Sequence, residues 1–586
     1  TISSLSISAN TSLNIANEIT LGGAAEIAED TTLTLNNTGT FGSTLNLKGS
    51  LDLVANQTVT GLISVGGDAS ISIPENITLN YSGGNLKVGD NTLSIAGAGI
   101  LSNAENSALV LDLENSTLDL SGTGTIAGPV RLEGCILKAS AGSPTISGTL
   151  TQYDDATIDV AMGATLNYSG PSLNLGPYKL TLKGGGTLNN TNSLVLNNAD
   201  SLLSLSGIAL KDVDASVSSN SGKGIEVTST ATMGDYSLSA VNYLNIADGQ
   251  TLSGQLILQS GGELFTSGEG QFDADIALAG GNFKATDDQV LGGTLTITED
   301  SGITVSEGKT LQLSQVGGLP LGANTLTLSG GGTFASGGIA LNNADSKLLL
   351  NSIILDSAST TADSLGLDVD SNSTVTAFEV GHITPVSIAD GVTLSGGVDV
   401  SAGSIKINET GTLASTITMS GGTLDVDETS TLSGALTQSG NLTIDVTNGK
   451  TLTYSGAAVN TGANTLTLIG GGALNNTNAF VLNNANSKLL LNNIVLYKAS
   501  TSLDNSGIDV DANSTIYALA IGHITPVSIA AGTSLGGEIS ATAGTIKLNE
   551  TGTLASNLDM SGGTLDADKT ATVSGTLTHS GDITID

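Results

Sequence analysis

The chain has 586 residues, among them 77 glycines, only 8 prolines and one cysteine, Cys135. Asp and Glu number 54 against 17 Lys and Arg, and the resulting net charge of -37 disfavours binding to nucleic acid or anionic membranes. A single cysteine excludes an intramolecular disulfide framework, and no run of about 18 apolar residues is present to insert into a membrane as a helix. Cys135 precedes Ile and Leu, so we expect it to be a small buried residue.

The first segment, residues 1–82, consists of short stretches in which apolar and polar residues alternate. Clear examples are Leu33–Leu35, Leu45–Leu47 and Ile71–Ile73. A period of two predicts strands with one buried face, and the Gly, Asn, Asp and Ser pairs between them predict turns.

Residues 83–320 continue this pattern with more variation. A triple glycine at 184–186 recurs at 330–332 and at 470–472. Because glycine lacks a Cβ atom, we expect these positions to take positive φ at tight corners. A phosphate-binding loop is disfavoured, since no Lys-Ser/Thr follows and no helix is predicted after the glycines.

A unit of about 20 residues is clearest between residues 321 and 586. Its best example is Ile388–Leu394, with the sequence IADGVTL. The final leucine of the unit falls at Leu394, Leu413, Leu432 and Leu452, in steps of 19, 19 and 20. A fixed period of this length indicates a solenoid, in which each unit contacts only its neighbours.

A longer period is superimposed on the short one. Residues 381–388 (GHITPVSI) reappear at 522–529, and the difference, 522 − 381 = 141, defines a long period of about seven short units. We predict a single continuous solenoid over residues 1–586, with degenerate coils in 1–165, a divergent repeat block in 166–320, a repeat block in 321–460 and an incomplete block in 461–586. Ile585-Asp586 matches Ile444-Asp445, after which the earlier copy continues, so we expect this to be a segment of a longer protein or a processed product.

The predicted fold is an all-β, right-handed parallel β-helix (β-solenoid) with about 20 residues per coil and almost no helix. Each strand would pair with its counterparts about 4.8 Å above and below, and parallel crossovers are overwhelmingly right-handed. Leu413 should then face inward, in a continuous column of aliphatic side chains.

One stretch imitates a calcium-binding loop. Asp368, Asp370 and Asn372 have the spacing of its first three ligands, and Glu379 stands at the twelfth place. The sixth place is Ser373 where glycine is required, and the copy one long period later has Ala520 in place of Glu379. Strand alternation explains the acids more simply, as outward residues, so we predict no metal site.

The histidines also give no site. His382, His523 and His579 are the only ones, and the first two are equivalent positions one long period apart. Polysaccharide-cleaving β-helix enzymes need a groove with clustered acids and aromatic platforms, whereas this chain has no Trp and 3% aromatics. We predict no enzymatic activity, no cofactor, and no catalytic, cofactor-binding or metal-binding residues.

The recurring pattern Val/Ile-x-x-Gly-x-Thr-Leu-x-Gly, with pieces such as Leu120–Ile126 (LSGTGTI), resembles the repetitive rod regions of large bacterial surface adhesins of the autotransporter and filamentous-haemagglutinin-like families. The resemblance implies a structural or adhesive fibre outside the cell or on the bacterial surface. Its partners would be a receptor or glycan on a host or neighbouring cell, or further copies of itself. An alternative is a subunit that polymerises end to end into a surface filament, because uncapped coils expose unpaired strand edges. A carbohydrate-acting or tailspike-like protein is a weaker alternative.

Overall fold

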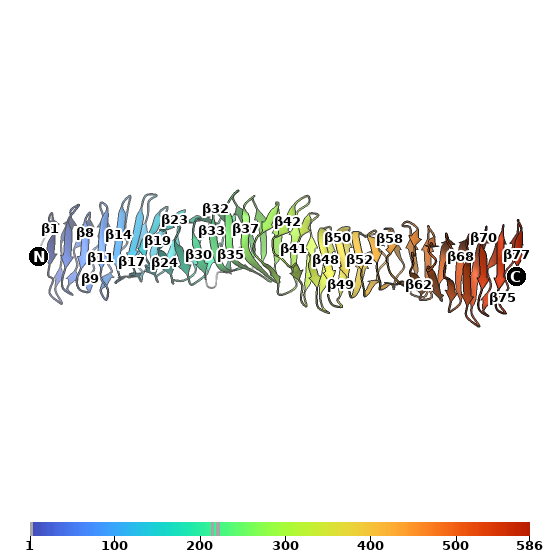
Figure 1. Ribbon diagram of the computed structural model, residues 1–586. Coiled ribbons are helices and arrows are strands. Elements are labelled where there is room, and N and C mark those ends of the chain that lie inside the picture. Colours follow the sequence, from blue (N-terminus) through green and yellow to red (C-terminus); the bar gives the residue numbers. More distant parts are fainter. Residues whose placement is uncertain (1–3, 213–215, 218–222, 239) are drawn as a thin grey trace. The chain divides into compact units, whose positions relative to one another are not determined.

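The computed structural model describes residues 4–212, 216–217, 223–238 and 240–586. All regular structure in this part of the chain is β-strand, and no helix occurs in it. The chain forms two compact units, Thr1–Thr296 with Leu313–Gln315, and Ile297–Gln312 with Val316–Asp586. Each unit is a stack of coils, seen in Figure 1 as successive short arrows.

The first unit contains three series of parallel strands. One is an eight-stranded sheet that begins with β1 (Ser4–Ile7), β4 (Ala24–Ile27) and β7 (Thr44–Leu47). Its strands pair in register, so that Ile7 lies opposite Ile27 and Ile27 lies opposite Leu47. Two other series run alongside, with members such as β14 (Thr92–Gly97) and β15 (Ile100–Asn103).

A coil of the second unit has three faces. One coil comprises β53 (Ser404–Ile407), β54 (Thr412–Leu413) and β55 (Thr416–Met419), and the next comprises β56 (Thr423–Val426), β57 (Ser430–Leu432) and β58 (Leu436–Gln438). We call the faces that begin with these strands first, second and third. All three pairings are parallel, with Ile405 opposite Leu424, Leu413 opposite Leu432, and Ile417 opposite Leu436. The partners in each pair are one short period apart in sequence, which confirms the predicted coil.

The core of each unit is the column of side chains that alternation turns inward. The four leucines that define the short period are each at most 2% exposed: Leu394, Leu413, Leu432 and Leu452. The inward placement of Leu413 is therefore confirmed. Stacking such rows buries apolar surface continuously, at roughly 25 cal/mol per Å² removed from water.

The triple glycines lie at corners, as predicted. The first two glycines of each have positive φ, with 110° at Gly184, 108° at Gly330 and 109° at Gly470, whereas the third does not. The third glycine is needed for close approach, since a Cβ on Gly332 would lie 2.4 Å from the Ser306 carbonyl oxygen. The chain therefore turns there against the coil below.

Buried polar side chains tie successive coils together. The Ser346 hydroxyl donates to the Gly322 carbonyl of the previous coil at 2.5 Å and accepts from the Asn343 N–H at 3.0 Å. Ser487, one long period later, makes the same pair of bonds to Gly462 and Asn484. These bonds satisfy backbone groups that would otherwise be buried without partners.

Three buried tyrosines serve the same purpose. Each hydroxyl accepts a hydrogen bond from a backbone N–H of the preceding coil, at 3.1–3.2 Å: Tyr81 from Ile63, Tyr168 from Leu150, and Tyr454 from Leu436. Burial raises the pKa of each phenol. Their hydroxyls thus remain neutral and act as structural links.

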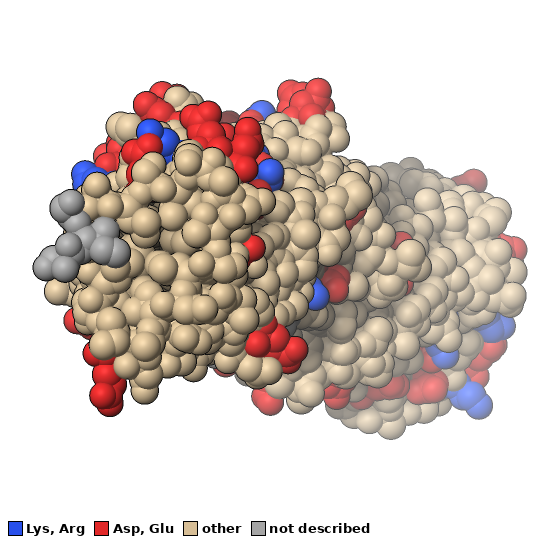
Figure 2. All heavy atoms as spheres, turned by 90° about the vertical axis from the view of Figure 1, so that its left-hand side faces the viewer, with Lys and Arg blue, Asp and Glu red and all other residues tan. Residues whose placement is uncertain are grey.

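Charged side chains stand on the outside of the coils. On the face shown in Figure 2, acidic atoms outnumber basic ones and gather in small groups between wide uncharged areas.

Within the described ranges, no helical segment has the length and apolar character needed to cross a bilayer.

Candidate binding groove on the third face of the second unit

A groove of about 640 Å³ lies on the third face of the second unit. Successive coils supply its floor: β66 (Val495–Thr501), β68 (Ser514–Ile521), β70 (Ser534–Ala541), β73 (Asn557–Met560) and β76 (Leu577–His579). Side chains that point into the core, such as those of Leu519 and Ile539, are each at most 2% exposed. They alternate along the strands with side chains that line the groove. The side chains between them face the groove.

Several of the outward side chains that line the groove are small. Ser500, Ala518, Ala520 and Ser540 line it. Longer polar and charged side chains also line it, namely Lys498, Glu538, Asn557 and Asp559. A hollow lined by hydrogen-bonding groups can accept a ligand that lies along the sheet.

We call the residues that directly precede the lining ones in β66 and β68 the edge of the groove, and they are a pair of exposed tyrosines. Tyr497 and Tyr517 immediately precede the lining residues Lys498 and Ala518, and their side chains are 38% and 51% exposed. Their ring centroids are 5.0 Å apart at an interplanar angle of 69°. In the following coil Gly537 pairs with Ile516, the residue before Tyr517, and the groove residue Glu538 comes next.

A buried asparagine fixes the backbone at this edge. The side-chain oxygen of Asn476 accepts from the N–H groups of Tyr497 (3.2 Å) and Lys498 (3.0 Å), and its amide nitrogen donates to the Lys498 carbonyl at 2.7 Å. Asn476 is 1% exposed. The Lys498 ammonium in turn donates to the Thr477 carbonyl at 2.8 Å. The edge is therefore held before any ligand arrives.

The equivalent corner one long period earlier has different chemistry. Asp356 and Thr376 stand where the later copy has the two tyrosines. The Asp356 carboxylate accepts from the N–H groups of Ser336 (3.0 Å) and Gly337 (2.9 Å), so it is used within the fold. Composition alone missed the tyrosine pair, and the mismatch between the two copies is the signal that would have revealed it.

The stretch that resembles a calcium-binding loop, residues 368–379, is extended strand in the structure. It falls on β49 (Gly366–Ser371) and β50 (Ser373–Val380), with Leu367 and Val369 buried between the acids. The Asp368 carboxylate lies 2.7 Å from the Lys347 ammonium. Strand alternation accounts for these acids, as predicted.

The histidines of the two copies have matching surroundings at a coil corner. His382 Nδ1 lies 3.7 Å from the Asp363 carboxylate, and His523 Nδ1 lies 3.8 Å from that of Asp504. His579 is exposed on β76, next to the groove residue Thr578.

Cys135 is 4% exposed, and burial raises the pKa of its thiol to about 12. The thiol is thus neutral at physiological pH and unreactive as a nucleophile. The expectation of a small buried residue is confirmed.

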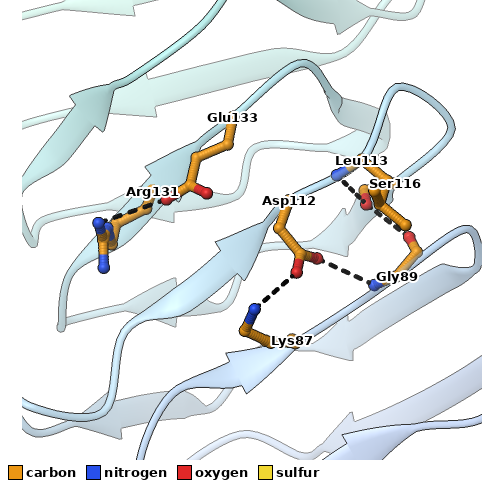
Figure 3. Close-up of polar contacts among 7 residues, drawn as sticks. All are labelled: Lys87, Gly89, Asp112, Leu113, Ser116, Arg131 and Glu133. Atoms are coloured by element: carbon orange, nitrogen blue, oxygen red, sulfur yellow. Dashed lines mark hydrogen bonds and ion pairs between the residues drawn. The ribbon is translucent and has the colours of Figure 1, made fainter.

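Several acids line a hollow of about 760 Å³ in the first unit, namely Asp112, Glu114, Glu133, Asp154 and Asp155. Figure 3 shows how two of them are used. The Asp112 carboxylate accepts from the Lys87 ammonium (3.0 Å) and the Gly89 N–H (3.3 Å) of the previous coil, and Glu133 pairs with Arg131 at 3.3 Å. Among the described residues, no three or more His, Cys, Asp or Glu side chains are arranged to hold a metal ion.

A charged network on the first face of the second unit shifts several pKa values. The Lys406 ammonium lies 2.7 Å from Asp427 and 3.1 Å from Asp425. Its hydrogen bond lowers the pKa of Asp427. Desolvation, followed by the charges of Asp425 and Asp427, raises the pKa of Asp445. Lys547 repeats the arrangement with Asp566 and Asp568, so we assign the network to coil stacking.

Comparisons of the chain with protein-family models, curated proteins and solved structures gave no match.

Proposed function

We propose that this chain is the structural and adhesive stalk of an extracellular fibre. The observation that carries the proposal is that residues of the same kind stack on one another in successive coils of each unit. Register partners one coil apart are both buried aliphatics, as at Ile405 and Leu424, or both outward polar residues, as at Thr412 and Thr431. Such a structure supplies stiffness and repeated surface, and its length is set by the number of coils.

An extracellular setting is consistent with the surface chemistry. A net charge of -37 spread over outward side chains keeps long particles from associating, and the single cysteine is buried away from oxidants. The polar links between coils, such as those of Ser346 and Ser487, need neither metal nor disulfide. We assign no catalytic role to the chain.

The proposal is tested by changing the number of coils without disturbing their register. Deleting residues 382–522 joins Gly381 to His523 and removes one long period, so the sequence at the junction is unchanged. Seven coils at about 4.8 Å each predict a particle shorter by about 34 Å in electron microscopy, with unchanged width. Deleting only residues 382–391 instead removes about half a coil and should disrupt the stack.

Two results would contradict the stalk. One is a deletion variant that collapses into a compact particle, and the other is a long dimension that does not change. Filaments far longer than one chain would point to end-to-end assembly instead. Location is tested separately, by antibody labelling and protease treatment of intact cells of the source organism, and labelling only after lysis would contradict an extracellular role.

A further inference from the structure

We propose that the groove on the third face of the second unit binds an uncharged oligosaccharide. The inference rests on the proposed function, because it supplies the adhesive surface of the stalk. The class of ligand is inferred from the side chains that line the groove and from those at its edge.

The exposed tyrosine pair supplies the apolar part of such a site. The rings of Tyr497 and Tyr517 are turned out of the core and contact each other at the surface, so packing of the core does not explain them. A sugar ring presents polarised C–H groups on one face, and these are attracted to the negative face of an aromatic ring. Two rings at 69° to each other offer faces to consecutive sugar units of a bent chain.

The groove floor supplies the polar part. The Lys498 ammonium has three N–H donors, and one of them donates to the Thr477 carbonyl, which leaves two for a ligand. Glu538 and Asp559 are acceptors, and the hydroxyls of Ser500 and Ser540 can donate or accept. The Asn557 amide nitrogen can donate, while its oxygen already accepts from the Thr576 N–H at 3.1 Å. This mixture suits hydroxyl groups, which are both donors and acceptors.

The charge of the groove and the pairing of its strands narrow the class of ligand. Two carboxylates and one ammonium line the groove of a chain with net charge -37, so an anionic glycan is disfavoured. A peptide strand finds no free backbone edge, because β68 pairs with β66 on one side and β70 on the other. Ala518 and Ala520 leave room for a flat ligand to reach the sheet.

The groove is held in place before binding and is peculiar to one copy of the repeat. Asn476 holds the edge through three hydrogen bonds to residues 497 and 498, which lowers the ordering cost of binding. The earlier copy has Asp356 and Thr376 in place of the tyrosines, so the chain carries its own negative control.

The experiment is isothermal titration of the full chain with cellohexaose, maltohexaose and the hexamer of N-acetylglucosamine, with a heparin hexasaccharide as the anionic comparison. We expect at least one uncharged hexasaccharide to bind with one site per chain. The double variant Tyr497→Ala, Tyr517→Ala should weaken that binding about tenfold or more. Ala518→Trp, which fills the groove, should abolish it, and Thr376→Ala in the earlier copy should leave it unchanged.

Several results would overturn the proposal: no binding of any uncharged hexasaccharide, preference for heparin, equal loss with Thr376→Ala, or self-association that the tyrosine variants remove. Hydrogen exchange over residues 476–520 checks that the variants keep the fold. The coil-deletion experiment does not depend on this groove, so failure of the stalk and failure of the sugar site are separate outcomes.

Discussion

At the scale of the residue, the coils are held in place by polar side chains that are buried among aliphatic ones. The hydroxyl of Tyr454 accepts from the Leu436 N–H at 3.1 Å and donates to the Ala457 carbonyl at 2.6 Å, while its ring lies in the core at 1% exposure. Without that hydroxyl both backbone groups lose a partner in a region that water does not reach.

Tyr454→Phe should therefore destabilise the second unit by about 1–3 kcal/mol, the cost of a buried unsatisfied polar group. Chemical unfolding measures the loss, and hydrogen exchange should locate it near residues 436–457. Tyr497→Phe, whose ring is exposed at the groove, is the matched control. An equal loss in the control would show that the hydroxyl of Tyr454 has no special role.

Leu413→Ala tests the aliphatic column. Its side chain is 2% exposed, so truncation should leave a cavity and cost about 2–5 kcal/mol in unfolding free energy. Thr412→Ala, on the outward side of the same strand, should cost far less. Similar costs for both would mean that the two faces of the strand are not distinguished by burial.

At the scale of the element, glycines set how closely one coil approaches the next. Gly396 in β52 (Thr393–Val400) has φ of 118°, and a Cβ there would lie 1.8 Å from the Val375 carbonyl oxygen. Gly391, in the turn just before the strand, has φ of 73° and nothing within 4 Å of an added Cβ.

Gly391→Ala should cost only the strain of a left-handed backbone, about 1–2 kcal/mol. Gly396→Ala must also displace the backbone of the coil below, and we expect a loss above about 4 kcal/mol. Thermal unfolding of the two variants beside the natural chain makes the comparison. If Gly396→Ala were as mild as Gly391→Ala, the close contact would be easily relieved.

The charged strands of the first face predict a pH effect. Asp445 lies opposite Asp425 in the ladder between β56 and β59 (Leu442–Val446), and its pKa is raised, first by desolvation and then by the neighbouring carboxylates. The folded state thus binds the proton more tightly than the unfolded state, so this residue lowers stability as pH rises through its folded pKa.

Asp445→Asn should then stabilise the second unit at pH 7, and the gain should disappear near pH 3, below the unfolded pKa of about 3.9. Denaturant midpoints at the two pH values measure it. Asp399→Asn, which removes the same charge from an exposed position of β52, should give no comparable gain. A gain that persists at pH 3 would exclude ionisation of Asp445 as its cause.

At the scale of the whole chain, periodicity was sufficient to predict the coils but not the hollows on their outer faces. The spacing of Leu394, Leu413 and Leu432 predicts both coil length and inward side chains, because a parallel ladder must repeat one residue pattern per turn. The same alternation says nothing about size or concavity. The groove depends on small outward residues such as Ala518 in several coils at once, which no single coil reveals.

Buried polar residues were also beyond the sequence pattern. Asn476 and Ser487 are residue types typical of turns, and only the paths of two neighbouring coils show that their side chains turn inward to backbone groups. The tyrosine pair at 497 and 517 was visible as a difference between copies, but its meaning required the groove whose lining includes the next residue of each strand, Lys498 and Ala518.

The in-register parallel pairing within each unit also determines how the protein responds to tension. The hydrogen bonds between coils run along the stacking direction, so a pull on the last strand peels one turn at a time rather than shearing many at once. Each released turn of about 20 residues yields about 70 Å of extensible chain in exchange for about 5 Å of height. A stack built this way lengthens turn by turn under load and dissipates work at each step.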